Sequence, residues 1–397
     1  MSRTNGLTKK ECIFLLALFL EVLTMLISLT TIPYMMNTDL CNLLLKIMRY
    51  AGYLIVVFKI IQDDYTVKKL VLVCLIVGLL FVNSTFVGNA VLCMSLFVMG
   101  MKGIDFDRMA SMVLPWFIMG VLITVAGSQL GVIDNWSYFV GTSRPRVSLG
   151  YFYPSHATSA LLYAVVLFCF VTKEKLSLWQ VVLIEIVNIW QWRQTDSRTG
   201  SALIAIIPWG FLILKYIKKD VSRSAIGWVL KAIFPLCAMI SLISCCFYGS
   251  FPFLVRVNSF VSGRISLGYD AIKTYGIHLF GQRIPWVGNG GLGHVVQQLQ
   301  ASYNFVDCSY VKILLDNGLI IWLIVMCIFT ATSIYAVNCN KKYLALALFF
   351  IAGYSVIEPR LIELGFNPFI LATAVVLDNR QMDTKNTTGR IEVTGVE

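Results

Sequence analysis

Long apolar runs recur along the whole chain, and they limit its possible folds more than any other feature. Several of them reach the roughly 17 to 25 residues that an α-helix needs to cross the hydrocarbon core of a bilayer. They lack the strict apolar–polar alternation that the strands of a membrane barrel show. A helix satisfies its own backbone hydrogen bonds inside hydrocarbon. We therefore predict an all-α polytopic membrane protein, with residues 1–397 forming a single integral membrane domain.

Apolar runs bounded by charged residues predict about twelve transmembrane helices. The third, fourth and last runs are short or closely abutted, and losing two of them together would leave the sidedness of the loops unchanged. The predicted spans are residues 12–31, 41–60, 69–82, 84–101, 111–128, 153–172, 177–192, 199–217, 226–248, 310–336, 342–357 and 365–378.

The distribution of basic residues predicts the orientation, because short cytoplasmic loops are enriched in Lys and Arg. One set of loops contains nearly all of the lysines, so both termini are predicted to be cytoplasmic. Residues 379–397 would then be a polar cytoplasmic tail. The longest loop, residues 249–309 between the ninth and tenth spans, is predicted to be external, and its length indicates a folded, functional segment. The MSRTNGLTKK start precedes a full-length apolar run and indicates no removable signal peptide.

Composition excludes several other classes of protein. The chain is 58% hydrophobic and 13% charged, with a mean hydropathy of +0.77, unlike an ordinary soluble domain. Its net charge of +11 is spread between apolar runs, so we predict no nucleic-acid partner. The eleven cysteines lie mostly inside apolar runs without CxxC or metal-type His spacing, so we interpret them as packing residues and predict no metal site.

The predicted external loops favour arginine over lysine. They contain only Lys273 among the lysines, with Lys46 and Lys312 at the edges of spans. Arginine offers a planar, bidentate donor for phosphate or carboxylate, whereas either residue serves for a solvated surface. This bias predicts an anionic ligand. The external arginines are Arg144, Arg146, Arg193, Arg198, Arg256, Arg264, Arg283 and Arg360.

Two arginine clusters precede predicted helix starts, where the helix dipole also favours anions. Arg144 and Arg146 come just before the sixth span, and they bind either an anionic ligand or lipid headgroups. Arg193 and Arg198 flank Asp196 between the seventh and eighth spans. There the alternative to ligand binding is an ion pair between Arg198 and Asp196.

The large external loop contributes the other candidates. Arg256 and Arg264 precede an amphipathic stretch and a GxG turn at Gly288 and Gly290. The glycines let the backbone approach a ligand or simply form a turn. The end of the loop leads into the tenth span, where an acidic side chain at the membrane edge either serves function or bonds to a neighbouring helix. The residues concerned are Asp307, Ser309, Tyr310 and Asp316.

Two histidines, His156 and His294, are candidate proton acceptors, with a packed structural role as the alternative for each.

Four segments in this order resemble the O-antigen polymerase and O-antigen ligase superfamily, and within it a capsular or O-antigen repeat-unit polymerase. The resemblance covers residues from about 144 to 320. Where ligases of the superfamily show His-Asn-x-Tyr before the tenth span, this chain has Asp307-Cys308-Ser309-Tyr310, which leaves Asp307 or a histidine from elsewhere as the base. The segments are RPRVSLGYFYPSH, TDSRTGSA, SGRISLGYDAIKTYGIHLFGQ followed by GNGGLG, and VDCSYVKILLDNGLI.

The resemblance implies a glycosyltransferase of surface-polysaccharide biosynthesis in the bacterial cytoplasmic (inner) membrane. Its donor and acceptor would be undecaprenyl-pyrophosphate-linked glycans, joined by inverting transfer without a metal or cofactor, and a flippase and a chain-length regulator would act in the same pathway. Asp307 or His294 would take the acceptor's proton, with Arg264 beside the reacting centre. The leaving pyrophosphate would be bound by Arg144, Arg146, Arg198, Arg256 and Arg264.

Two alternatives remain. A ligase would use the same arginines, and a lipid-linked-sugar flippase would also have about twelve spans. The departure at Asp307 favours a polymerase over a ligase. Charges gathered beside one large loop, rather than at the membrane midplane of two related halves, favour a transferase over a transporter.

Overall fold

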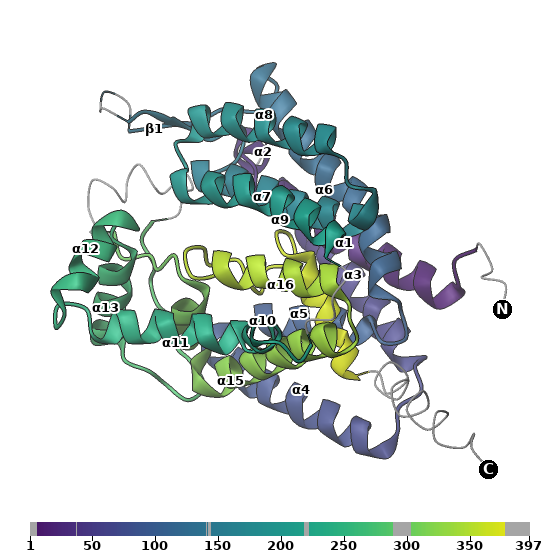
Figure 1. Cartoon of the computed structure of the whole chain (residues 1–397). Helices are drawn as coiled ribbons and strands as arrows, with labels where there is room; N and C mark the ends of the chain where they lie inside the picture. Colours follow the sequence, from purple (N-terminus) through teal and green to yellow (C-terminus); the bar gives the residue numbers. More distant parts are fainter. Residues whose placement is uncertain are drawn as a thin grey trace, which may run out of the picture.

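The structure is a computed structural model, and it describes residues 6–36, 38–139, 141, 144–217, 222–288 and 303–377. Within these ranges the secondary structure is almost entirely helical, and the only β-structure is one short hairpin and an isolated bridge (Figure 1). This confirms the predicted all-α class. The helices form one assembly in which α7, α9 and α16 lie between α8 on one side and α11 and α15 on the other.

Six described helices are long and apolar enough to cross a membrane, and a seventh span results if α10 and α11, bent by 69°, are counted together. These features support a multi-pass membrane protein. The six are α1 (Lys9–Ser28), α4 (Val67–Val87), α6 (Phe106–Gln129), α7 (Pro154–Thr172, continued by η1, Lys173–Lys175), α9 (Arg198–Tyr216) and α15 (Ser309–Asn338), and the bent pair is α10 (Ala225–Lys231) and α11 (Ile233–Cys246).

The predicted count of twelve spans is not confirmed. Helical structure does occupy every predicted run, but three of these elements are too short to span alone: α5 (Ala90–Gly100), α16 (Lys342–Tyr354) and the 3₁₀-helix η2 (Pro368–Leu377). Two others are long but are not among these six: α3 (Thr38–Ile61) is apolar but contains four charged residues, and α8 (Leu178–Thr195) contains Glu185, Arg193 and several amides. The third predicted run, which looked short, is the 21-residue helix α4.

Helix α7 lies at the centre of the core, and 72% of the residues in its apolar stretch are buried. Before it, strands β1 (Ser137–Tyr138) and β2 (Arg146–Val147) form an antiparallel hairpin. The bridge between Thr30 and Tyr151 ties this hairpin segment to the short helix α2 (Ile32–Met35) that follows α1. Pro154 then occupies the first turn of α7, where its missing N–H costs nothing. The start of α7 is therefore fixed by the bridge that precedes it and by the proline in its first turn.

Helix α15 is broken at Gly318, whose φ of 81° interrupts the helical path. The segment after α13 (Arg264–Tyr275) fills the break, since the N–H of Leu319 donates to His278 O at 2.9 Å. From α4, Asn83 donates its amide to Phe280 O at 2.8 Å and to Asn317 O at 2.9 Å. Freed backbone groups at membrane depth need such partners.

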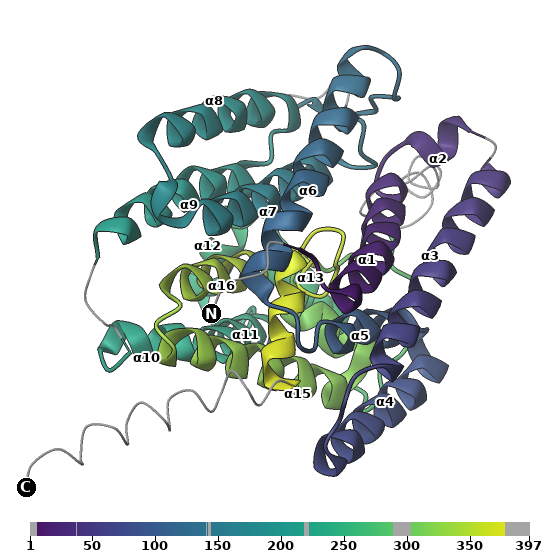
Figure 2. The same ribbon diagram turned by 90° about the vertical axis from the view of Figure 1, so that its right-hand side faces the viewer.

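The described part of the predicted external loop is folded. It contains α12 (Pro252–Phe260) and α13, which lie together at the left of the molecule in Figure 1 and behind the other helices in Figure 2. Asn258 of α12 accepts hydrogen bonds through Oδ1 from the N–H groups of Ile265 and Ser266, at 2.9 and 3.1 Å, so it fixes the start of α13. Gly290 and His294 lie outside the described residues.

Candidate functional site

A cavity of about 530 Å³ lies where α7, α9, α13 and α15 begin. We call it the arginine cavity. Its volume is in the range of sites that bind small ligands. The side chains that carry charge in its lining are Arg144, Arg146, Arg198, Arg264, Asp196, Asp307 and Glu358, and Tyr153, Ser197, Tyr303 and Tyr354 are among the others.

Four helix N-termini face this region, because the N-cap residues Tyr153, Ser197 and Gly263 begin α7, α9 and α13 and Cys308 begins α15. Unpaired N–H groups and the helix dipole make each such end favourable for an anion. The sequence placed arginines before two of these starts, and the structure brings all four starts together. The helix N-termini therefore add to the positive electrostatic potential that the arginines create in the cavity.

Arg146 reaches into the cavity from strand β2. Its Nε donates to Thr195 O at 2.6 Å, its Nη2 donates to Ser197 Oγ at 3.1 Å, and its guanidinium lies 5.7 Å from the centre of the Tyr153 ring. Within the described part of the chain, Arg146 forms no ion pair with a carboxylate. Arg146 is therefore held in place by neutral groups, and its positive charge is available to a ligand.

Asp196 forms ion pairs with two further arginines that line the cavity, Arg144 and Arg198. It adopts the left-handed conformation at the end of α8, and it pairs with Arg198 at 3.1 Å and with Arg144. Burial alone would raise the pKa of Asp196, but Arg144 and Arg198 lower it below its usual range. The ion pair between Arg198 and Asp196, foreseen as the alternative to ligand binding, is thus formed. Both arginines still line the cavity, so the pair orients them beside it.

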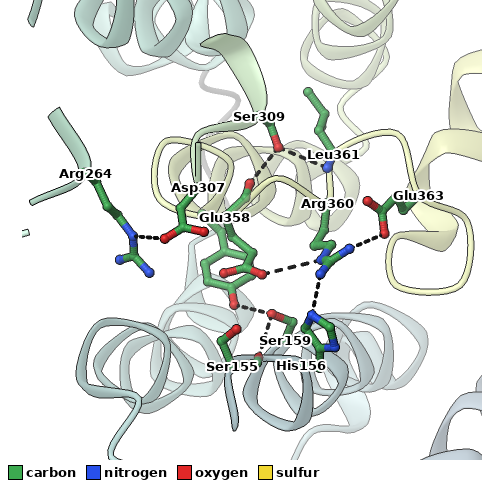
Figure 3. A network of polar contacts seen from close by, with 11 residues as sticks. Ser155, His156, Ser159, Arg264, Asp307, Ser309, Glu358, Arg360, Leu361 and Glu363 are labelled. Carbon is green, nitrogen blue, oxygen red and sulfur yellow. Dashed lines mark hydrogen bonds and ion pairs between the residues drawn. The ribbon is translucent and has the colours of Figure 1, made fainter. Parts of the chain in front are cut away.

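Arg264 and Asp307 form the opposite wall, with Nε of Arg264 3.3 Å from Oδ2 of Asp307 (Figure 3). Their side chains are 20% and 22% exposed, so both can reach a ligand. Burial raises the pKa of Asp307 above its usual range, although the guanidinium groups of Arg264 and Arg360 oppose the shift. Asp307 is therefore a better proton acceptor than an exposed aspartate.

Glu358 is a second carboxylate of the cavity, and the sequence analysis did not identify it. It follows α16, and its backbone oxygen accepts a hydrogen bond from Ser309 Oγ at 2.6 Å. Burial raises the pKa of Glu358 to about 7; Arg360 opposes the shift, and the charge of Asp307 adds to it. The two carboxylates are therefore electrostatically coupled, and the charge of one raises the pKa of the other.

Behind Glu358, Arg360 contacts three side chains and connects its own segment to α7 (Figure 3). Its Nη1 donates to Glu363 at 2.6 Å, its Nε lies 3.5 Å from Glu358, and its Nη2 lies 2.6 Å from Nε2 of His156 on α7. Since an arginine can only donate, His156 accepts through Nε2. His156, a candidate proton acceptor, is buried in this network and does not line the cavity.

Other predicted site residues lie elsewhere. Arg256 on α12 and Arg193 on α8 are exposed and do not line the cavity. Tyr310 is fully buried and donates to Ala352 O at 2.9 Å. Asp316 binds Lys312 at 2.6 Å and Trp286 at 2.8 Å, and it lines a different cavity. His294, the other predicted base, falls outside the described residues.

The arrangement combines four arginines with three carboxylates in one cavity, so its charge is positive and becomes more so when Glu358 is protonated. Such a site can bind an anion of high charge and accept a proton within the same volume. Comparisons with protein-family models, with curated proteins and with solved structures gave no match to this chain.

Proposed function

We propose that the chain is a polysaccharide polymerase, a glycosyltransferase that joins undecaprenyl-pyrophosphate-linked repeat units at the external face of the bacterial cytoplasmic membrane. The observation that carries the proposal is the arginine cavity, whose lining combines four arginines with two carboxylates of raised pKa. The product would be a capsule or O-antigen polysaccharide. The resemblance of residues from about 144 to 320 to the O-antigen polymerase and ligase superfamily supports the same activity.

The reaction requires two functions that this cavity combines. The oxygen of an acceptor hydroxyl attacks the anomeric carbon of the donor, and its proton passes to a base, for which Asp307 and Glu358 are placed. The bond between the anomeric carbon and the pyrophosphate breaks on the opposite side, so the configuration is inverted. Arg146 and Arg264 stabilise the charge that develops on the leaving pyrophosphate, so this step needs neither a metal nor a cofactor.

A ligase that moves finished glycan onto another carrier is the second candidate. It would use the same arginines, and Asp307 in place of the ligase-type histidine favours the polymerase. A flippase is less well supported, because the charged residues of the arginine cavity lie together around the starts of α7, α9, α13 and α15. A chain-length regulator and a flippase of the same pathway are the expected partners.

Deletion of the gene tests the proposal through the glycans that accumulate. A strain without a polymerase should carry single repeat units on its lipid carrier or surface, and the long polymer should disappear. The wild-type gene supplied from a plasmid should restore the polymer, and a variant with Asp307→Asn should not. Long polymer retained on the lipid carrier would instead identify a ligase, and units trapped on the cytoplasmic side would identify a flippase.

A further inference from the structure

A second cavity, of about 600 Å³, lies on the other side of the segment that contains Glu358. We call it the aromatic cavity, because Tyr50, Tyr53 and Trp286 line it. The segment after α16 contributes to both cavities: Ile357 and Glu358 line the arginine cavity, whereas Pro359, Ile362 and Glu363 line the aromatic one. Helices α1 and α3, the beginning of α5 and the beginning of α15 form its other walls.

Two of the cationic side chains that line the aromatic cavity are not paired with a carboxylate of the described residues. Its lining carboxylates are already paired: Asp316 with Lys312 at 2.6 Å, Glu363 with Arg360 at 2.6 Å and Glu21 with Arg49 at 3.7 Å. Lys46 and Arg283 also line the cavity and are exposed, and within the described ranges neither takes part in an ion pair. The cavity therefore offers positive charge to a ligand.

Buried polar atoms in the wall of the aromatic cavity also indicate a ligand. Oε2 of Glu21 and Nε of Arg49 are the two atoms of the 3.7 Å ion pair named above; both are buried, and among the described residues neither has a hydrogen-bond partner. Buried polar groups are usually satisfied, so an unsatisfied pair beside a cavity indicates a ligand or water that completes it. The tyrosine and tryptophan rings in its lining, of which Tyr50 is the most exposed, offer apolar surface to the faces of sugars.

An apolar groove of about 140 Å³ continues from the aromatic cavity. Val91, Met94 and Ile362 line both, so the two spaces adjoin. The groove is lined almost wholly by apolar side chains of α4, α5, α15 and η2. It extends along α15 from Ile321 to Phe329, away from the end where the aromatic cavity lies.

We propose that the aromatic cavity and the apolar groove together bind a second lipid-linked glycan, with its pyrophosphate and first sugars in the cavity and a short part of its polyprenyl chain in the groove. This inference rests on the proposed function, since a polymerase must hold two lipid-linked substrates at once. The leaving pyrophosphate of the donor occupies the arginine cavity. The aromatic cavity therefore binds the acceptor, whose terminal sugar passes the segment from Ile357 to Glu363 to reach Asp307.

Photocrosslinking from the protein tests the proposal directly. Benzoylphenylalanine is placed at Leu72, which lines the groove on α4, and for comparison at Leu122, an exposed leucine of α6 outside it. The probe is labelled undecaprenyl pyrophosphate added to the purified protein in detergent. We expect capture at Leu72 to exceed capture at Leu122 by about tenfold or more, and an excess of phosphatidylglycerol should not displace it. Equal capture at both positions, or displacement by phosphatidylglycerol, would overturn the proposal, because the groove would then be an ordinary lipid contact.

Charge reversal tests the head-group site. Arg283→Glu should lower capture at Leu72 by about tenfold through loss of a charge-assisted contact. Lys273→Glu on α13 removes an exposed cation that lines neither cavity and should leave capture unchanged. If Arg283→Glu fails to fold, Arg283→Gln serves in its place. Unchanged capture in a folded Arg283 variant would contradict the proposal.

A third crosslinking position separates this proposal from the proposed function. Leu267 on α13 lines the arginine cavity, where the donor is expected. Capture at Leu267 without capture at Leu72 would overturn the second site and leave the polymerase proposal in place. Capture at neither position would count against both, and capture at both positions is the expected result.

Discussion

At the scale of single residues, the choice between arginine and lysine carried most of the information about the site. The bias toward arginine in the predicted external loops identified Arg144, Arg146, Arg198 and Arg264, and all four line one cavity. Glu358 was missed because it lies far along the chain from Asp307, between two apolar runs that both looked like spans. Only tertiary packing brings these two carboxylates together, and a single sequence does not record such a contact.

We predict that Arg146→Lys and Arg264→Lys each reduce polymer formation by on the order of 10²-fold, because lysine keeps the charge but loses the bidentate geometry. The polymer is measured in cells in which the membrane content of each variant is matched. Arg223→Lys, an exposed position far from the cavity, is the control and should make normal polymer. Normal polymer from both cavity variants would assign these side chains to lipid headgroups.

Asp307→Asn is nearly isosteric and removes the basicity of this side chain, so we expect a loss on the order of 10²- to 10⁴-fold in transfer rate with the lipid donor still bound. The measurement is the initial rate of chain extension by purified protein. Activity retained in Asp307→Asn and lost in His294→Ala would transfer the role of base to His294.

The raised pKa of Glu358 predicts a pH dependence. Below about pH 7 this carboxyl is protonated and cannot accept a proton, so activity should increase as the pH rises through about 7. Glu358→Gln cannot titrate and should lose this increase. The check is a pH profile of the initial rate for both proteins. If the profile of Glu358→Gln matches that of the wild type, another group controls the rate.

At the scale of elements, apolar runs located the helices but not their irregularities. The sequence does not distinguish the short helices α5 and α16 from full spans, because hydropathy measures burial in either lipid or protein. The apolar run likewise predicted a single span for α15, although Gly318 breaks this helix. A side chain at Gly318 would place its Cβ 2.2 Å from the backbone N of Gly281, so the two segments meet backbone to backbone.

Gly318→Ala should therefore destabilise the protein by roughly 3 kcal/mol, since alanine would meet both an unfavourable positive φ and a backbone clash. Gly353→Ala in α16 is the matched control, because nothing lies within 4 Å of its added Cβ, and it should be neutral or slightly stabilising. Thermal unfolding of the purified variants in detergent provides the comparison. Similar unfolding temperatures for both would indicate that α15 continues through Gly318.

At the scale of the whole molecule, the orientation in the membrane is predicted from the loops alone. Ser259→Cys on α12 should react with an impermeant thiol reagent in intact cells whose outer membrane is permeable to it, in a background that lacks the native exposed cysteines. Thr66→Cys, between α3 and α4, should react only after lysis. The reverse pattern would invert the predicted topology.

The segment from Ile357 to Glu363, which separates the two cavities, has a consequence for how chains grow. In the proposed mechanism, the lengthened glycan is attached after one transfer to the lipid that entered as acceptor, in the aromatic cavity. To be extended again as donor, its pyrophosphate must move to the arginine side. Chain growth would then require the lipid-linked glycan to transfer from one cavity to the other after each addition. At every such transfer the glycan could dissociate into the bilayer instead. Final length would be decided by the competition between recapture and escape, which is the step on which a separate length regulator would act.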